Sequence, residues 1–176
     1  MIENLECIYS IIFPLLPFSF VAALLGFIII LVSNVVKSLQ KNYQKLKLIG
    51  KILFTQVFIV GIILVVLQTI ILKNIQNEFI ETLRKSNTEI TQSDYTFGTF
   101  DNQILKTELL KTKDIQPHHS GTDRIMKICM KAGNEISNIR IEQDSQNKNE
   151  FWVFWDKYWF GNGDEEIGRF YSNNLK

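Results

Sequence analysis

The sequence predicts an α+β membrane protein: a two-helix transmembrane hairpin, then a small domain of one helix and a four-stranded antiparallel meander. Uncharged apolar stretches run from Ile8 to Val36 and from Leu53 to Leu72. A bilayer core takes roughly 20 apolar residues in a helix, so each stretch is long enough to cross it. The second half of the 176-residue chain has no such stretch and instead carries short alternating segments separated by turn signals, which predicts the domain.

The two apolar stretches predict transmembrane helices at about residues 13–36 and 53–73. Pro14 and Pro17 fall at the start of the first helix, where proline costs little because the first N–H groups of a helix have no intrahelical partner. Buried helices of a soluble core are the alternative, but such helices keep a polar stripe that these stretches lack. The tail before the first helix has Glu3 and Glu6 and no basic residue, which argues against a cleaved signal peptide and for a retained anchor.

The loop at 37–52 predicts the orientation of the hairpin. It contains five lysines and no acidic residue: Lys37, Lys41, Lys45, Lys47 and Lys51. The positive-inside rule places such a loop in the cytoplasm. We therefore expect a multi-pass protein of a bacterial inner membrane, with the Lys-rich loop cytoplasmic and the C-terminal domain periplasmic or extracellular. Lys73, Arg84 and Lys85 after the second helix are the competing signal.

Composition shifts predict three parts: a hairpin at 1–76, a juxtamembrane helix and linker at 77–100, and a soluble domain at 101–176. In the hairpin, Ala22 and Gly26 on one helix and Gly61 on the other are small residues that would let the two backbones approach closely. At the end of the hairpin, Asn74–Arg84 continues the second helix with an amphipathic pattern. The polar segment 86–93 is interpreted as a linker, and 95–100 as a short possible strand.

The domain begins with Asp101, a helix-capping residue, and we expect a helix from Asn102 to about Lys113. Alternating apolar residues and short turns then predict four strands joined as a meander. These strands are Arg124–Ala132, Glu135–Glu142, Glu150–Phe160 and Ile167–Tyr171, separated by turns at 133–134, 143–149 and 161–164.

Charge and cysteine content limit the partners. The net charge is +1, and residues 77–176 are mildly acidic, which argues against nucleic acid because phosphate binding needs a basic patch. The lipid bilayer is the expected partner of the hairpin. Cys7 and Cys129 are the only cysteines; a disulfide between them stays open, although a free buried thiol at Cys129 fits its apolar surroundings better.

The aromatic segment Glu150–Phe160 is the best candidate for a binding surface. A half-exposed strand alternates apolar and polar residues, whereas this one is apolar on both faces, with Phe151, Val153 and Trp155 on one. The second face is either buried inside the domain, placed at the membrane interface, or used to bind a partner. The candidate partner-binding residues are Trp152, Phe154, Trp155, Tyr158 and Trp159.

Other side chains that could carry chemistry form no convincing site. His118 and His119 with Asp123 lack the ligand number and spacing that zinc needs, and an exposed loop explains them better. The acidic run at 164–166 has no base or nucleophile beside it and is best explained as a solvated turn. We therefore expect no cofactor, no metal and no catalytic residues.

The expected function is binding. The chain is interpreted as an anchored accessory, sensor or immunity-type protein that binds a protein or ligand through its exposed domain and is not an enzyme. The alternative is an oligomeric pore-forming or membrane-perturbing effector gated by the C-terminal domain. An envelope enzyme, built on the loop at 118–119, is the weakest of the three hypotheses.

Overall fold

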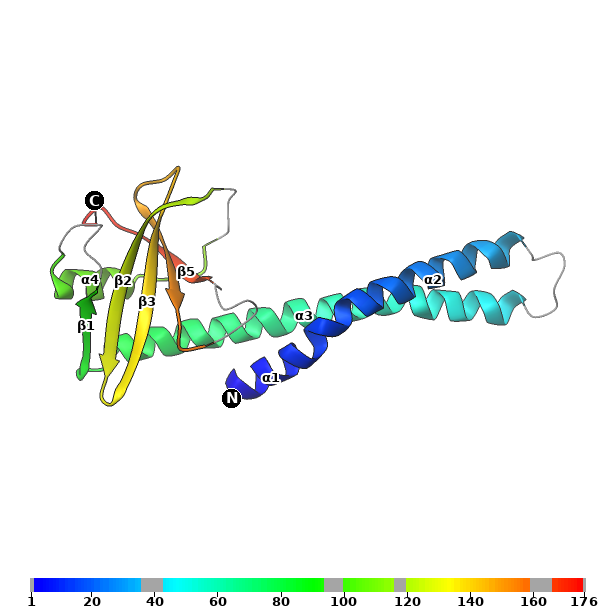
Figure 1. Cartoon of the computed structure of the whole chain (residues 1–176), viewed down its shortest axis with the longest axis horizontal. Helices are drawn as coiled ribbons and strands as arrows, with labels where there is room; N and C mark the ends of the chain where they lie inside the picture. Colours follow the sequence, from blue (N-terminus) through cyan, green and yellow to red (C-terminus); the bar gives the residue numbers. More distant parts are fainter. Residues whose placement is uncertain (1, 36–42, 94–99, 116–119, 159–165, 176) are drawn as a thin grey trace. The chain divides into compact units, whose positions relative to one another are not determined.

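The structure, a computed structural model, describes residues 2–35, 43–93, 100–115, 120–158 and 166–175. The chain divides into two compact units, Met1–Ile71 and Leu72–Lys176, which are described separately below. Helices form the first unit, and a helix-covered antiparallel sheet forms the second (Figure 1). The predicted α+β class is therefore confirmed.

The first unit consists of α1 (Ile2–Ile12), a short 3₁₀ turn η1 (Phe13–Leu15), α2 (Leu16–Val35) and the first part of α3 (Tyr43–Arg84). Pro14 lies in the 3₁₀ turn, and Pro17 follows in the first turn of α2, where a missing N–H costs little. Two helical stretches, of 34 and 42 residues, are long and apolar enough to cross a membrane. Both extend beyond the predicted limits of 13–36 and 53–73.

Helices α2 and α3 meet at two glycines. A Cβ added to Gly26 would lie 2.6 Å from the carbonyl oxygen of Gly50, and one added to Gly50 would lie 2.8 Å from that of Gly26. The two backbones thus touch, as small residues allow. Gly26 was predicted to lie at this contact, but its partner is Gly50 instead of Gly61, and Ala23 is the buried alanine of α2.

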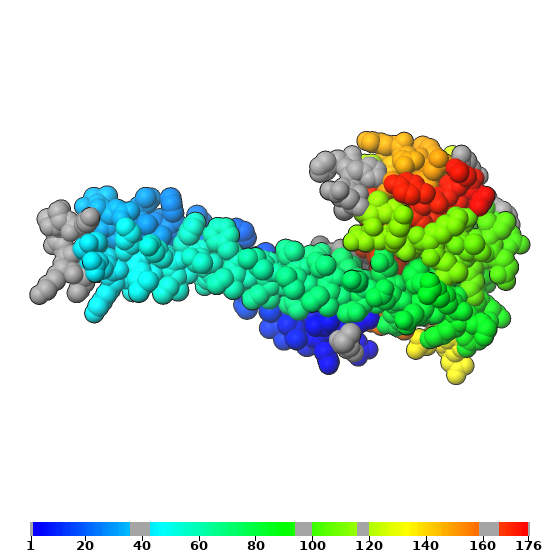
Figure 2. Space-filling model, turned by 180° about the vertical axis from the view of Figure 1, so that it is seen from behind, coloured from blue at the N-terminus to red at the C-terminus, as the bar shows by residue number. Residues whose placement is uncertain are grey.

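The rest of the hairpin presents large apolar side chains outward. Phe18 is 72% exposed, Ile62 65% and Val35 81%. Near the ends of the two helices, the Lys47 ammonium donates a hydrogen bond of 2.8 Å to the side-chain oxygen of Asn34. Figure 2 shows α2 and the first part of α3, in blue and cyan, lying side by side.

The second unit contains a five-stranded antiparallel sheet in the order β1-β2-β3-β4-β5, one strand more than the sequence predicted. The additional strand is β1 (Thr88–Gln92), in the segment interpreted as a linker. Its side chains alternate between buried and exposed, but only Ile90 among the buried ones is apolar. Buried Thr88 is satisfied because its hydroxyl donates 2.6 Å to the Thr82 carbonyl. The possible strand at 95–100 lies almost wholly outside the described residues.

The other strands are close to those predicted. They are β2 (Thr122–Ala132), β3 (Glu135–Asp144), β4 (Glu150–Trp155) and β5 (Glu166–Tyr171). Gly133 in the β2–β3 turn has φ +63°, a conformation that glycine adopts readily. The aromatic strand ends at Trp155, before the predicted Phe160, because residues 156–157 form a turn.

Helices cover one face of this sheet, which we call the inner face. The last turns of α3 contribute Ile75, Phe79 and Leu83, and α4 (Asn102–Leu109) contributes Leu105 and Leu109, all at most 1% exposed. Asp101 caps α4 as predicted, accepting hydrogen bonds from the backbone N–H groups of residues 103 and 104. The helix ends at Leu109 instead of Lys113 because the chain leaves it to pair with β5: the backbones of Lys113 and Arg169 exchange two hydrogen bonds of 2.9 Å.

Candidate functional site

Strand β4 divides its side chains between the two faces of the sheet. Phe151, Val153 and Trp155 point to the inner face and are 0%, 0% and 4% exposed. Trp152 and Phe154 point to the opposite face, which we call the outer face, and are half-buried. The alternation predicted for the aromatic strand is present, and its two sets of side chains lie in different environments.

Two of the candidate binding residues contact the end of α3. The Trp155 ring lies 5.4 Å from the Phe79 ring, and its Nε1 donates 2.9 Å to the Ser137 hydroxyl. The Tyr158 hydroxyl donates 2.6 Å to a carboxylate oxygen of Glu78. These contacts fasten the helix to the sheet, so both side chains are engaged within the domain. Trp159 lies outside the described residues.

The other two candidates each contact an arginine. The Arg169 guanidinium carbon lies 4.1 Å from the centre of the Trp152 ring, and that of Arg140 lies 4.3 Å from the Phe154 ring. Both distances fall within the range of cation–π interactions. Arg140 also pairs with Glu142, its Nε lying 2.7 Å from a carboxylate oxygen. Arginines thus hold the two outer aromatic rings in fixed positions.

Strand register extends these contacts into a surface. On the outer face, Ile125 and Lys127 of β2 lie opposite Glu142 and Arg140 of β3, which lie opposite Trp152 and Phe154 of β4. Ile125 is 42% exposed, Lys127 is exposed and the Arg140 side chain is 31% exposed. We call Ile125, Lys127, Arg140, Trp152 and Phe154 the outer-face patch. It combines apolar surface with the positive charge of Lys127 and the Arg140–Glu142 ion pair.

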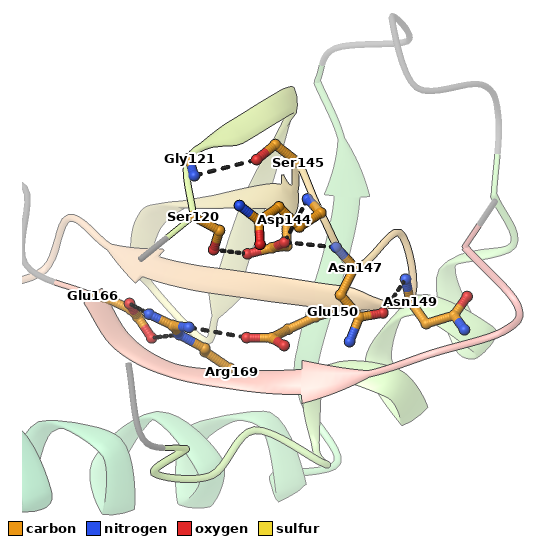
Figure 3. Close-up of polar contacts among 10 residues, drawn as sticks. Ser120, Gly121, Asp144, Ser145, Asn147, Asn149, Glu150, Glu166 and Arg169 are labelled. Carbon is orange, nitrogen blue, oxygen red and sulfur yellow. Dashed lines mark hydrogen bonds and ion pairs between the residues drawn. The ribbon is translucent and has the colours of Figure 1, made fainter. Parts of the chain in front are cut away.

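A buried charge network lies beside the outer-face patch (Figure 3). Arg169, 2% exposed, donates from Nη1 to Glu150 at 2.9 Å, and from Nε and Nη2 to Glu166 at 2.6 and 2.9 Å. Burial of the guanidinium lowers its pKa, but the bonds to Glu166 and Glu150 outweigh that effect and raise the pKa above its ordinary value. The network keeps Arg169 charged, and Trp152 packs on it.

The indole nitrogen of Trp152 differs from the charged groups of this network, which are all hydrogen-bonded. It is buried and has no hydrogen-bond acceptor among the residues that the structure describes. An unpaired buried donor costs about 1–3 kcal/mol.

Asp144, next to this network, has a structural role. It is fully buried, and its carboxylate accepts hydrogen bonds from the Ser120 hydroxyl and from the backbone N–H groups of Gln146 and Asn147 (Figure 3). These bonds fix the turn between β3 and β4. At the same end, Lys148 pairs with Asp123, one of the residues considered with the histidines.

The remaining candidate positions are distributed as follows. His118, His119, Asp164 and Glu165 lie outside the described residues, whereas Glu166 binds Arg169. Cys7 and Cys129 are free thiols. Across the described ranges, no group of three or more histidine, cysteine or acidic side chains is placed to hold a metal ion.

Sequence reasoning missed both arginines of the site. Arg140 and Arg169 were not singled out because each meets its aromatic partner through strand pairing, from a different strand. Their alternation with apolar neighbours, as in Ile139–Ile141, is the signal that places them on the outer face.

Comparison of the chain with protein-family models, with curated proteins and with solved structures finds no match.

Proposed function

We propose that the chain is a membrane-anchored binding protein: α2 and the first part of α3 cross the bilayer, and the outer-face patch binds a protein or ligand. The observation that carries the proposal is the pair Trp152 and Phe154, held by arginines on the face of the sheet that the helices do not cover. Tryptophan and arginine are enriched among residues that dominate binding energy. The proposal assigns no catalytic step to the domain.

The membrane anchor is supported by the exposed apolar surface of the hairpin. Side chains such as Phe18, Leu24 and Ile62 are more than half exposed along helices long enough to span the hydrocarbon core. Contiguous apolar surface of this extent is rare on soluble monomers. Lys45, Lys47 and Lys51 lie at the start of α3 and support a cytoplasmic loop, with the domain outside a bacterial inner membrane.

Binding through the outer face is supported by contacts that occupy backbone groups on both edge strands of the sheet. On β5, the backbone of Arg169 is paired with Lys113, and the Ile167 carbonyl accepts a bond from the Gln76 side chain. On β1, the Thr88 carbonyl accepts 2.8 Å from the Lys106 ammonium. These contacts oppose addition of a partner's strand, the usual mode of edge recognition. The outer-face patch is then the better docking surface.

Photo-crosslinking in living cells tests this assignment. We expect a crosslinking amino acid at Phe154 to give a discrete adduct, and the same group at Ile104, which is 46% exposed on α4, to give none. Replacing Trp152 by alanine should remove the adduct formed at position 154 while leaving the protein in the membrane fraction. Equal adducts at the two positions, or none at either, would refute the outer-face patch as the binding surface.

The orientation has its own test. Alkaline phosphatase, which is active only outside the cytoplasm, is fused to the C-terminus, and a fluorescent protein that matures in the cytoplasm serves as the matched reporter. We expect phosphatase activity with the first fusion and a weak signal with the second. The opposite result would place the domain in the cytoplasm.

A further inference from the structure

The first unit contains an apolar groove between its two long helices. The groove has a volume of about 710 Å³ and is open along one side. Phe20, Ala23 and Phe27 of α2 line one wall, and Phe54, Phe58 and Gly61 of α3 line the other. Every side chain that lines it is apolar, so it offers no hydrogen bond to orient a polar ligand.

The two long helices of the hairpin contain three glycines. Contacts within the chain explain why two of these positions are glycine. Gly26 and Gly50 allow α2 and α3 to touch, because a side chain on either would collide with the backbone of the opposite helix. At Gly61, by contrast, an added Cβ would meet no atom of another part of the described chain within 4 Å. Glycine inside a helix costs roughly 0.5–1 kcal/mol relative to alanine, and no contact among the described residues offsets that cost at Gly61.

Gly61 lies on the side of α3 that already contacts α2. Gly61 follows Gly50 by about three helical turns, so both lie on nearly the same side of α3. The groove therefore continues the surface through which α3 already packs on α2. Its lining residues on α3, such as Phe54, Phe58 and Ile62, repeat at the spacing of one helix face. A surface with this spacing is complementary to another helix.

We infer that the groove is the contact surface for a second copy of this chain, with α3 packing against α3 and Gly61 facing Gly61 across a two-fold axis. A glycine at the centre lets two backbones approach closely where the lipid removes the hydrophobic drive between helices. A two-fold axis places the same surface on both copies, which matches a single self-complementary glycine. A lipid acyl chain would fit the apolar lining but gives no reason for a glycine in the wall that α3 contributes.

This inference rests on the proposed membrane insertion, and its test separates the two. The full chain, labelled with one fluorophore per copy, is reconstituted into liposomes over a series of protein-to-lipid ratios. Insertion is scored first, by resistance to alkaline extraction. Photobleaching steps then count the copies in each inserted particle. Two-step bleaching that increases with the protein-to-lipid ratio is the expected result.

The variant Gly61→Leu adds a side chain to the groove wall formed by α3 and should weaken the dimer by about tenfold, equivalent to about 1.4 kcal/mol, without loss of insertion. The matched control is Ile63→Phe, which adds bulk at an exposed position of α3 that does not line the groove and should leave the dimer unchanged. Single-step bleaching at every ratio overturns the inference, including the case of monomers that carry bound phospholipid in native mass spectra. A dimer unaffected by Gly61→Leu also overturns it, whereas a chain that fails to insert refutes the proposed function instead.

Discussion

Arg169 and Glu150 form a buried ion pair in the second unit, with Nη1 of the arginine 2.9 Å from Oε1 of the glutamate and side chains 2% and 1% exposed. Removing two charges from water costs several kcal/mol per ion unless good geometry and further hydrogen bonds compensate. Here Glu166 binds the remaining side of the guanidinium. The pair joins β4 to β5 and provides the surface on which Trp152 packs.

Replacing Arg169 by methionine should lower the free energy of unfolding of the second unit by about 3–5 kcal/mol, because Glu150 is left buried without its counterion. Urea unfolding followed by tryptophan fluorescence measures this effect. All three tryptophans of the chain belong to the second unit, so the signal does not depend on the hairpin.

Arg140→Met is the matched control for this variant, because Arg140 also stacks on an outer-face ring but is 31% exposed. Arg140 and Glu142 are 31% and 12% exposed, so their pair is less buried than that of Arg169, and this variant should lose less stability. In the double variant Arg169→Met with Glu150→Gln, part of the lost stability should return, because the uncompensated charge is removed. Equal losses for Arg169→Met and Arg140→Met would contradict the prediction.

The surroundings of Glu108 predict that the stability of the second unit depends on pH. Burial raises the pKa of this carboxyl, but hydrogen bonds from Lys111, Asn174 and Ser172 outweigh burial and hold the pKa below its usual value of 4.5. A carboxyl whose pKa is lowered by folding contributes stability above its unfolded pKa, and this contribution is lost as the pH falls through the folded pKa. Glu108 thus stabilises the second unit at neutral pH and ceases to do so in acid.

The variant Glu108→Gln should flatten this acid response. We expect the urea midpoint of the native chain to fall as the pH is lowered from about 6 to about 3, and the fall to be smaller in the variant. Glu89→Gln, an exposed carboxyl on β1, is the control and should leave the profile of the native chain unchanged. Identical slopes for Glu108→Gln and the native chain would show that Glu108 does not contribute.

Hydrophobic periodicity was sufficient to predict most of the fold. It located the long apolar helices, the helix capped by Asp101 and four strands, because each of these buries an apolar stripe of the expected period. It missed β1, since Thr88–Gln92 buries two polar side chains, Thr88 and Gln92, and only one apolar residue, so the segment lacks the apolar alternation of a strand. Periodicity also does not predict the burial of Glu108, a charged residue whose carboxylate is satisfied by Lys111 and Asn174.

The candidate site was predictable only in part, for a similar reason. Alternation along β4 separates Trp152 and Phe154 from Trp155 without any knowledge of the fold. The arginines that contact those rings are 14 to 17 residues away in sequence and meet them through strand register. Register depends on turn geometry and on the packing of the whole sheet, which local sequence patterns do not determine.

The contact between Gly26 and Gly50 predicts how the hairpin responds to a side chain at its crossing. Gly26→Leu should push α2 and α3 apart, because no space exists between the two backbones. Spin labels at Val32 and Ile49, both about half exposed, would report a longer distance between the helices in detergent. Ile63→Ala is the control and should not change that distance, since Ile63 is exposed on α3 and does not line the groove. An unchanged distance in Gly26→Leu would contradict the close crossing.

Gly168 is the position of β5 where an added side chain should be least tolerated. Its φ is +154°, and a Cβ there would lie 2.9 Å from the Lys113 carbonyl oxygen and 2.6 Å from the side-chain nitrogen of Gln76. The Gln76 side chain can move, but the Lys113 backbone is fixed by its two hydrogen bonds to Arg169. Gly168→Ala therefore combines an unfavourable backbone conformation with a collision against the edge of the sheet.

We expect Gly168→Ala to lower the free energy of unfolding of the second unit by about 3 kcal/mol, the combined size of backbone strain and overpacking. Gly133→Ala is the matched control, because Gly133 also has a positive φ but its nearest neighbour would lie 3.5 Å from the added carbon. The free energy of unfolding of that variant should fall by about 1–2 kcal/mol, because of the positive φ alone. Urea unfolding followed by tryptophan fluorescence measures both. Equal losses would mean that the close approach of β5 to Lys113 and Gln76 adds nothing, and the excluded-volume argument at Gly168 would fail.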